Sequence, residues 1–129
     1  MKLVKDVMVT EIIKTSPFST LREALSLMKR HNVKSLVVER QNEHDAWGLI
    51  TYTNVLKAVI AEDGDIDLLN VYDVCAKPVI SVGESLSLRH AASLMTEHRV
   101  KRLLVLADNE LKGFVVMDDI MQALLDTID

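Results

Sequence analysis

The chain has 129 residues, of which 49% are hydrophobic and 26% charged, with a formal net charge of −4. This composition is typical of a globular protein and excludes disordered, collagen-like and linker-like chains, since there are only 4 glycines and 2 prolines. The acidic balance and the few aromatic residues disfavour a nucleic-acid-binding protein, which needs basic patches and rings that stack on bases.

The sequence contains an internal repeat, which determines how its elements are interpreted. Aligning residues 1–38 with 68–105 pairs identical residues at fifteen of the 38 positions. After a shift of two residues, Gly48–Asn54 aligns with Gly113–Asp119. The predicted organisation is a first motif over residues 1–61, an acidic connector over 62–67 and a second motif over 68–129.

The first half predicts a strand, a helix, two strands and a second helix. Ile12 and Ile13 form a short extended segment, and a capping box of Thr20 and Glu23 begins a helix with an apolar stripe through Met28. Buried strands follow at 35–38 and 47–50. The second helix has an apolar face made of Val55, Leu56, Val59 and Ile60.

The second half predicts the same five elements. An extended segment at Val79 and Ile80 precedes a helix, strands at 103–106 and 112–116, and a final helix. Because half of this chain is too short to bury much surface alone, the two sheets are expected to pack against each other. The fold class is therefore α/β (α+β), with two pseudo-symmetric strand-helix-strand-strand-helix motifs packed through their sheets.

The single cysteine, Cys75, excludes an internal disulfide and suits a reducing compartment. The amino-terminal residues include several charges and do not fit a signal peptide, and no apolar run approaches the roughly 18 residues of a membrane span. We therefore expect a cytoplasmic protein that does not bind a membrane.

Several repeated blocks together carry a family resemblance. Asp6-Val7-Met8 recurs as Asp73-Val74-Cys75, the run 24–28 recurs as 91–95, and glycine-led strand-to-helix turns follow in both halves. The pattern resembles a tandem pair of CBS domains, named after cystathionine beta-synthase, and it covers about residues 1–61 and 68–127.

The resemblance implies a regulatory module without catalytic residues or a required cofactor. The four histidines, His31, His44, His90 and His98, do not form a metal-binding pattern, so no metal is expected. CBS pairs commonly bind AMP, ADP, ATP or S-adenosylmethionine in the cleft between the motifs and regulate an attached or partner protein. They also commonly associate as homodimers. The alternative is a dimerising protein-interaction module with degenerate, unoccupied clefts, and an enzyme acting alone ranks below both.

The family signature is a glycine, two apolar residues, a hydroxyl residue, two variable residues and an aspartate. A phosphate can bind near the hydroxyl and the helix amide groups, while the carboxylate accepts from ribose. The first half keeps Thr51 but has Asn54 in place of the aspartate, and the second keeps Asp119 but has Val116 in place of the hydroxyl. The alternative is that Thr51 or Thr53 simply caps the helix and that Asp118 is an ordinary cap or first-turn carboxylate.

The resemblance places basic residues near a ligand phosphate, and Lys101, Arg102 and Lys34 occupy those positions. The alternative is a solvated strand edge. Since adjacent strand residues point to opposite faces, Lys101 and Arg102 cannot both be assigned to one cleft. The predicted adenine contacts, which are individually also candidates for the core, are Ile12, Ile13, Val79 and Ile80.

Overall fold

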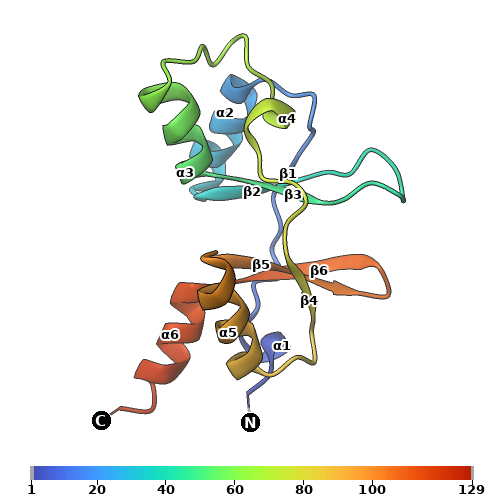
Figure 1. Ribbon diagram of the computed structural model, residues 1–129, viewed down its shortest axis with the longest axis vertical. Coiled ribbons are helices and arrows are strands. Elements are labelled where there is room, and N and C mark those ends of the chain that lie inside the picture. The colour runs from blue at the N-terminus through green and yellow to red at the C-terminus, as the bar shows by residue number, and fades with distance from the viewer. Residues whose placement is uncertain (1, 129) are drawn as a thin grey trace. The chain divides into compact units, whose positions relative to one another are not determined.

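The computed structural model describes residues 2–128, and its contacts divide the chain into two compact units. Unit 1 comprises Met1–Ile12 and Ile80–Asp129, and unit 2 comprises Ile13–Val79. Each unit therefore combines the sheet of one sequence motif with the short helix that begins the other motif (Figure 1).

Unit 2 contains one three-stranded sheet covered by helices (Figure 1). Strand β2 is central, pairing in parallel with β1 and antiparallel with β3. The strands are β1 (Lys14–Thr15), β2 (Ser35–Val38) and β3 (Gly48–Thr51), and the helices are α2 (Leu21–His31), α3 (Tyr52–Val55), the π-helical η1 (Leu56–Ala61) and α4 (Val71–Val74).

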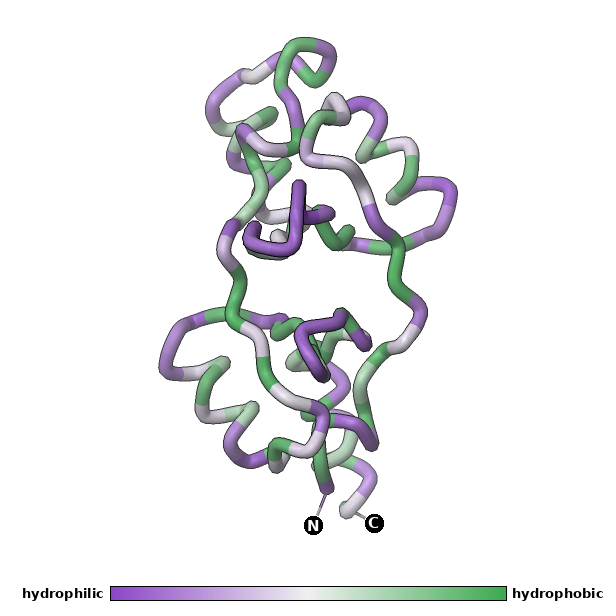
Figure 2. The backbone as a smooth tube through the Cα atoms, turned by 90° about the vertical axis from the view of Figure 1, so that its right-hand side faces the viewer, coloured by the Kyte–Doolittle hydropathy of each residue, from purple (hydrophilic) through white to green (hydrophobic). Residues whose placement is uncertain are grey.

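Unit 1 repeats this topology around the central strand β5. Its helices alternate hydrophobic and hydrophilic segments, as expected for helices with one apolar stripe (Figure 2). Its elements are α1 (Val4–Val7), β4 (Ser81–Gly83), α5 (Leu88–His98), β5 (Arg102–Ala107), β6 (Glu110–Val116) and α6 (Met117–Leu125).

The predicted order of strand, helix, strand, strand and helix is found in both halves, but each half also has a short helix before its first strand, α1 and α4, that was not predicted. The first strand of each motif begins later than predicted, at Lys14 and Ser81. Ile13 and Ile80 each accept one strand hydrogen bond, but they lie where the chain passes from one unit to the other. The predicted packing of one sheet against the other stays a prediction.

The capping box of α2 is confirmed. Thr20 Oγ1 accepts a hydrogen bond from the Glu23 amide at 3.2 Å, and Glu23 Oε1 accepts one from the Thr20 amide at 3.3 Å. These bonds satisfy amide groups that the first helical turn leaves unpaired. Leu21, Ala24 and Met28 then bury the apolar stripe of the helix against the sheet.

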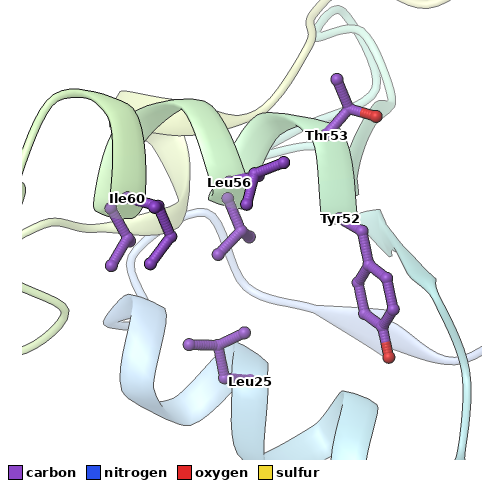
Figure 3. A pocket seen from close by; sticks show the side chains of 7 residues that line it. Leu25, Tyr52, Thr53, Leu56 and Ile60 are labelled. Carbon is purple, nitrogen blue, oxygen red and sulfur yellow. The ribbon is translucent and has the colours of Figure 1, made fainter.

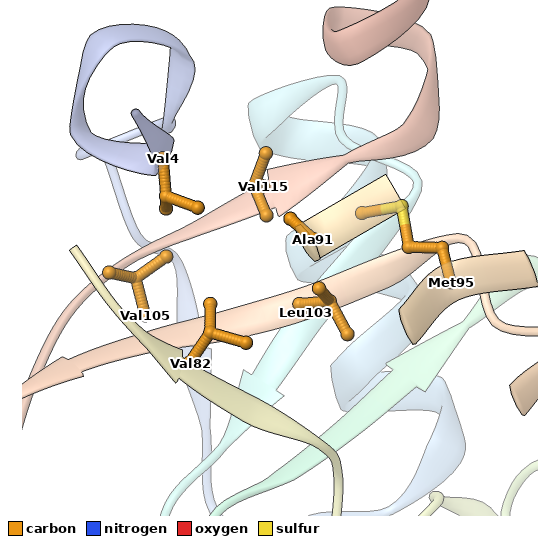
Figure 4. Packing of buried hydrophobic residues seen from close by; sticks show 7 residues of the cluster. All are labelled: Val4, Val82, Ala91, Met95, Leu103, Val105 and Val115. Carbon is orange, nitrogen blue, oxygen red and sulfur yellow. The ribbon is translucent and has the colours of Figure 1, made fainter. Parts of the chain in front are cut away.

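Each unit has its own hydrophobic core. In unit 1 the buried side chains come from α1, α5 and all three strands and converge between the sheet and the helices (Figure 4). They are Val4, Val82, Ala91, Met95, Leu103, Val105 and Val115. The corresponding core of unit 2 includes Val71 from α4, so a helix from the other motif completes each core.

The segments that follow α1 and α4 close the sheets through backbone hydrogen bonds. The Val9 amide donates to the Phe114 carbonyl at 2.8 Å, and the Phe114 amide donates back to Val9 at 3.0 Å. Leu49 and Ala76 exchange an equivalent pair of bonds in unit 2. The glycines that lead the strand-to-helix turns, Gly48 and Gly113, lie directly beneath these crossing segments.

The acidic segment 62–67 is solvated but also anchored to unit 2. Its four carboxylate residues are exposed, whereas Ile66 packs against the core. The Gly64 amide donates to the Ala58 carbonyl at 2.9 Å, and Asp67 pairs with Arg22 on α2. The connector thus follows the surface of the unit instead of crossing free solvent.

Among residues 2–128, Thr15 is the one buried polar residue, with 3% of its surface exposed. Its Oγ1 has no hydrogen-bond partner within these residues. We expect Thr15→Val to stabilise the protein by about 1 kcal/mol, because valine keeps the shape and removes the unpaired hydroxyl. Thr20→Val, which removes a used cap, should instead destabilise by about 1 kcal/mol. Thermal unfolding of both variants measures this, and a loss of stability for Thr15→Val contradicts it.

Candidate functional site

In unit 2, Thr51 and Asn54 bind each other at the start of α3. Thr51 Oγ1 accepts from the Asn54 amide at 3.4 Å, and Asn54 Oδ1 accepts from the Thr51 amide at 2.9 Å and from Thr51 Oγ1 at 3.0 Å. The interpretation of Thr51 as a helix cap is therefore confirmed. The hydroxyl proton is already used, which leaves the Asn54 side-chain N–H groups as the donors available to a ligand.

In unit 1, Asp118 and Asp119 lie in the first turn of α6, as predicted from the sequence. The helix begins after Val116, which provides no side-chain cap. Within residues 2–128, no side-chain hydrogen bond or ion pair engages either carboxylate. The positive end of the helix dipole stabilises negative charge at this position, so unit 1 presents two unengaged acceptors at the end of its last strand.

The predicted basic residues lie next to these helix starts. The Tyr52 amide of α3 donates to the Lys34 carbonyl at 3.2 Å, and the Met117 amide of α6 donates to the Lys101 carbonyl at 2.9 Å. In unit 1, Arg102 is also paired directly with Val116 across the sheet. In each unit the backbone of a basic residue thus lies at the helix start, next to the end of a strand.

Lys101 and Arg102 have different surroundings, which agrees with the alternation expected along a strand. Leu103 and Val105 belong to the core cluster beneath the helices, so Arg102 belongs to the opposite face of the sheet. Lys101 is exposed, whereas Arg102 is half-buried and its Nε has no hydrogen-bond partner within the part of the chain described. A buried donor without a partner is costly and would be satisfied by an anion.

The predicted adenine contacts are all half-buried and lie where the chain passes between the units. Ile13 packs against the core of unit 2, and Ile80 packs against the core of unit 1. For these two residues the structure supports a packing role. Ile12 and Val79 belong to neither core cluster.

An apolar groove between α2, α3 and η1 has a volume of about 430 Å³ (Figure 3). Leu25 of α2 points toward Leu56 and Ile60 of η1, with Tyr52 at one end (Figure 3). The sequence predicted the apolar helix face but not the groove, which needs the neighbouring helix. The apolar stripe of residues 55–60 is what any amphipathic helix shows, so it carried no signal for a groove.

Sequence reasoning also missed a basic cluster at the β2–β3 hairpin of unit 2. Lys14 Nζ and Arg40 Cζ lie 5.4 and 5.2 Å from the Trp47 ring centroid, within cation–π range. Lys77 Nζ lies 2.6 Å from Asp45 Oδ2, and this hydrogen bond is the main cause that lowers the pKa of the Asp45 carboxyl. These contacts tie the hairpin to the segment after α4.

Other residues that could bind a metal or act as a nucleophile lie apart from these helix starts. His31 and His98 are the last residues of α2 and α5. Burial raises the pKa of the Cys75 thiol, which packs against the core of unit 2. No group of three or more His, Cys, Asp or Glu residues within 2–128 is placed to hold a metal ion. Over the same residues, no helix has the length and apolar character needed to cross a membrane.

The family model of the CBS domain matches twice, over residues 4–61 and 71–126. The chain belongs to the CBS domain family. The sequence resemblance to a CBS pair is therefore confirmed, and each match contains one strand-to-helix turn with its glycine.

Relatives and solved structures agree with this assignment. The CBS domain-containing protein YhcV of Bacillus subtilis is 33% identical over 93% of this chain and 84% of its own length. This chain spans only 57% and 43% of two longer relatives, from Methanopyrus kandleri and Thermofilum pendens.

Two solved structures illustrate the likeness of the CBS pair. A hexameric CBS-CP12 protein from bloom-forming cyanobacteria has a TM-score of 0.91 at 25% identity, covering 100% of this chain and 76% of that one. The CBS pair of protein MJ0100, in complex with 5-methylthioadenosine and S-adenosyl-L-methionine, has a TM-score of 0.83 at 23% identity, covering 98% of each. The predicted α+β fold of two CBS motifs is confirmed.

Proposed function

We propose that this CBS pair is a cytoplasmic regulatory module that binds an adenosine-containing ligand, either AMP, ADP, ATP or S-adenosylmethionine. Ligand binding, in this proposal, changes how the chain acts on a partner protein. The module performs no chemistry of its own.

The observation that carries the proposal is a pair of polar groups that have no hydrogen-bond partner within residues 2–128. Asp119 in the first turn of α6 offers a carboxylate, and Arg102 at the start of β5, paired with Val116 across the sheet, has a buried Nε. A carboxylate accepts from the two hydroxyls of a ribose, and a guanidinium binds phosphate oxygens. The two groups are complementary to opposite parts of one nucleotide.

Unit 1 is the stronger of the two candidate sites. In unit 2, the Thr51 hydroxyl and the Asn54 side-chain oxygen are already hydrogen-bonded to each other, so fewer of their groups are available to a ligand. Lys34 is exposed and adds a cation there, so we propose a weaker second site at Lys34, Thr51 and Asn54. In unit 1 we propose Lys101 and Arg102 for phosphate and Asp119 for ribose, with Asp118 beside them. The proposed adenine contacts remain Ile12, Ile13, Val79 and Ile80.

The complex of MJ0100 with two adenosine compounds supports this choice of ligand class, because it has the same fold. Each unit has one departure from the signature, Asn54 in unit 2 and Val116 in unit 1, and the alternative of an interaction module with unoccupied clefts rests on these departures.

Thermal unfolding in the presence of AMP, ADP, ATP and S-adenosylmethionine tests the proposal. A ligand that binds only the folded protein, at 100 times its Kd, stabilises it by about 2.7 kcal/mol. We expect at least one of the four to raise the Tm by several degrees, with guanosine triphosphate as the matched control. No shift with any of them at millimolar concentration would count against ligand binding.

A second proposed activity, self-association, is favoured by the exposed groove of unit 2. Leu56 and Ile60 are 60% and 71% exposed although they line an apolar groove. Exposed apolar patches rimmed by polar residues mark interaction surfaces. We propose that the chain self-associates through its helix faces, and that this also applies if the nucleotide sites are empty.

A further inference from the structure

Two aromatic side chains meet on the surface of unit 2, outside the apolar groove. Phe18, in the turn before α2, and Tyr72, in α4, are 64% and 52% exposed. Their ring centroids lie 6.2 Å apart in an edge-to-face arrangement, with 67° between the ring planes. Large aromatic side chains dominate the binding energy of protein interfaces, so an exposed pair of them is a candidate contact for a partner.

The fold itself does not need aromatic residues at these two positions. In the sequence repeat, Phe18 and Tyr72 align with Ser85 and Lys5 of unit 1. Both units keep the same backbone contact there. The Tyr72 amide donates to the carbonyl of the residue before Phe18 at 3.0 Å, and the Lys5 amide donates to the carbonyl of the residue before Ser85 at 2.9 Å. Because unit 1 makes this contact with polar side chains, the aromatic pair is a feature of the surface of unit 2 alone.

The chain segments around the aromatic pair are acidic. Backbone hydrogen bonds hold residues 17–22 beside residues 66–72. Residues 16–23 and 62–76 together contain one basic residue, Arg22, and six carboxylates, which are Glu23, Glu62, Asp63, Asp65, Asp67 and Asp73. Two of these carboxylates are fixed close to the rings, because Glu23 and Asp73 close the capping boxes of α2 and α4.

The neighbouring cations already have partners. Arg22 and Lys57 each pair with a carboxylate of the segment 62–67. Lys14 and Lys77 contact the β2–β3 hairpin instead. Even with both pairs counted, the carboxylates around the aromatic pair exceed the cations, so this surface attracts positive charge.

We propose that the aromatic pair and the carboxylates around it bind a basic, arginine-containing segment of a partner protein. A guanidinium stacks on aromatic rings and also pairs with carboxylates, so it is complementary to both features of this surface. The same carboxylates repel nucleic acid and anionic membranes. This inference rests on the proposed action on a partner protein, and it specifies the surface and the kind of partner.

Fluorescence anisotropy with a short labelled peptide that alternates arginine with leucine tests this surface. The control peptide has glutamate in place of arginine. We expect only the arginine peptide to bind, and the variant Phe18→Ser/Tyr72→Lys to bind it about tenfold more weakly. The variant carries the residues that unit 1 has at these positions, so it should fold, which thermal unfolding checks. No binding of the arginine peptide to the unmodified chain would overturn the inference.

Tyr52→Lys is the matched control for the aromatic substitutions. Tyr52 is also an exposed aromatic residue of unit 2, but it lines the apolar groove, and its replacement adds the same charge. We expect this variant to bind the arginine peptide nearly as well as the unmodified chain. An equal or larger loss with Tyr52→Lys would place the peptide in the groove and overturn the assignment to the aromatic pair.

A second variant keeps both rings and removes only charge. Glu23→Gln/Asp73→Asn retains the side-chain oxygens that accept from the Thr20 and Asn70 amides, so both capping boxes can still form. It should weaken binding of the arginine peptide about threefold. Unchanged binding would overturn the role of the carboxylates and with it the basic character of the partner.

Two further measurements separate this inference from the other proposals. Titration with adenosine compounds should give the same result for Phe18→Ser/Tyr72→Lys and for the unmodified chain. A chain that binds an adenosine compound but not the arginine peptide contradicts this inference alone, whereas the reverse supports it and contradicts the ligand proposal. Sedimentation should show no change of oligomeric state in the variant. A change would assign the aromatic pair to a contact between copies and overturn the inference.

Discussion

The Gly113→Ala variant is expected to be about 3 kcal/mol less stable than the unmodified protein, which lowers the Tm by about 10 °C. A Cβ at this position would overlap the backbone carbonyl of Val9, which crosses the sheet there. Backbone cannot move aside as a flexible side chain can, and Val9 is held by two hydrogen bonds to Phe114.

Two other glycines serve as matched controls in the same unfolding experiment. A Cβ at Gly83 meets nothing within 4 Å, so Gly83→Ala should be close to neutral. A Cβ at Gly48 would lie 3.0 Å from the Ala76 carbonyl oxygen and 3.2 Å from Val38 Cβ, which predicts a smaller loss than at Gly113. Equal stability of the Gly83 and Gly113 variants would contradict the close crossing.

This result would also explain why a glycine leads the strand-to-helix turn in both motifs. Neither Gly48 nor Gly113 has a positive φ, so the requirement is for space and not for backbone freedom. The crossing segment comes from the other sequence motif in each case. The glycine in each turn therefore has a structural role, because it leaves room for the crossing segment, in addition to any role in a ligand site.

The second large effect is expected at the proposed ribose contact. Asp119→Asn should weaken binding of the adenosine ligand by about 30-fold, since losing a charge-assisted hydrogen bond costs about 2 kcal/mol. Asn is nearly isosteric and retains an acceptor, so folding should be preserved. Titration calorimetry of the variant measures the loss.

Asp126→Asn is the matched control, because Asp126 lies at the opposite end of the same helix. It should leave the affinity unchanged. If Asp119→Asn binds as tightly as the unmodified protein, then Asp119 is only a first-turn carboxylate that stabilises α6. Binding unaffected by Asp119→Asn but reduced by Thr51→Val would move the main site to unit 2.

Local patterns predicted the elements well, because each depends on neighbouring residues. The capping box of Thr20 and Glu23 and the apolar stripe through Met28 are contained within one helix. The internal repeat then doubled the information, since each element was visible twice. Boundaries of the short strands were less accurate, because the residues before Lys14 and Ser81 connect the two units.

Features that depend on distant parts of the chain were not visible in the sequence. The placement of α1 with β5 and β6, and of α4 with β2 and β3, joins the strands of one motif to the first helix of the other. The Lys77–Asp45 contact joins residues 32 positions apart. Charge and hydropathy patterns along one segment contain no information about such partners.

The sequence predicted the residues of the candidate site but not which of them already make hydrogen bonds within the protein. The sequence predicted Thr51, Asn54, Asp119 and the basic residues as ligand contacts, which stays a prediction, and it left open whether Thr51 caps a helix. The structure shows that the cap is formed, whereas the carboxylates of α6 are unengaged within residues 2–128. Which hydrogen bonds a side chain already makes depends on rotamers, and these are not encoded in spacing.

Calorimetric titration of the unmodified protein with AMP, ATP and S-adenosylmethionine tests the regulatory account most directly. The account predicts saturable binding of at least one of them with a Kd below about 1 mM, corresponding to a binding free energy of about −4 kcal/mol or better. No saturable heat for any of the three, with a protein shown to be folded, would contradict it.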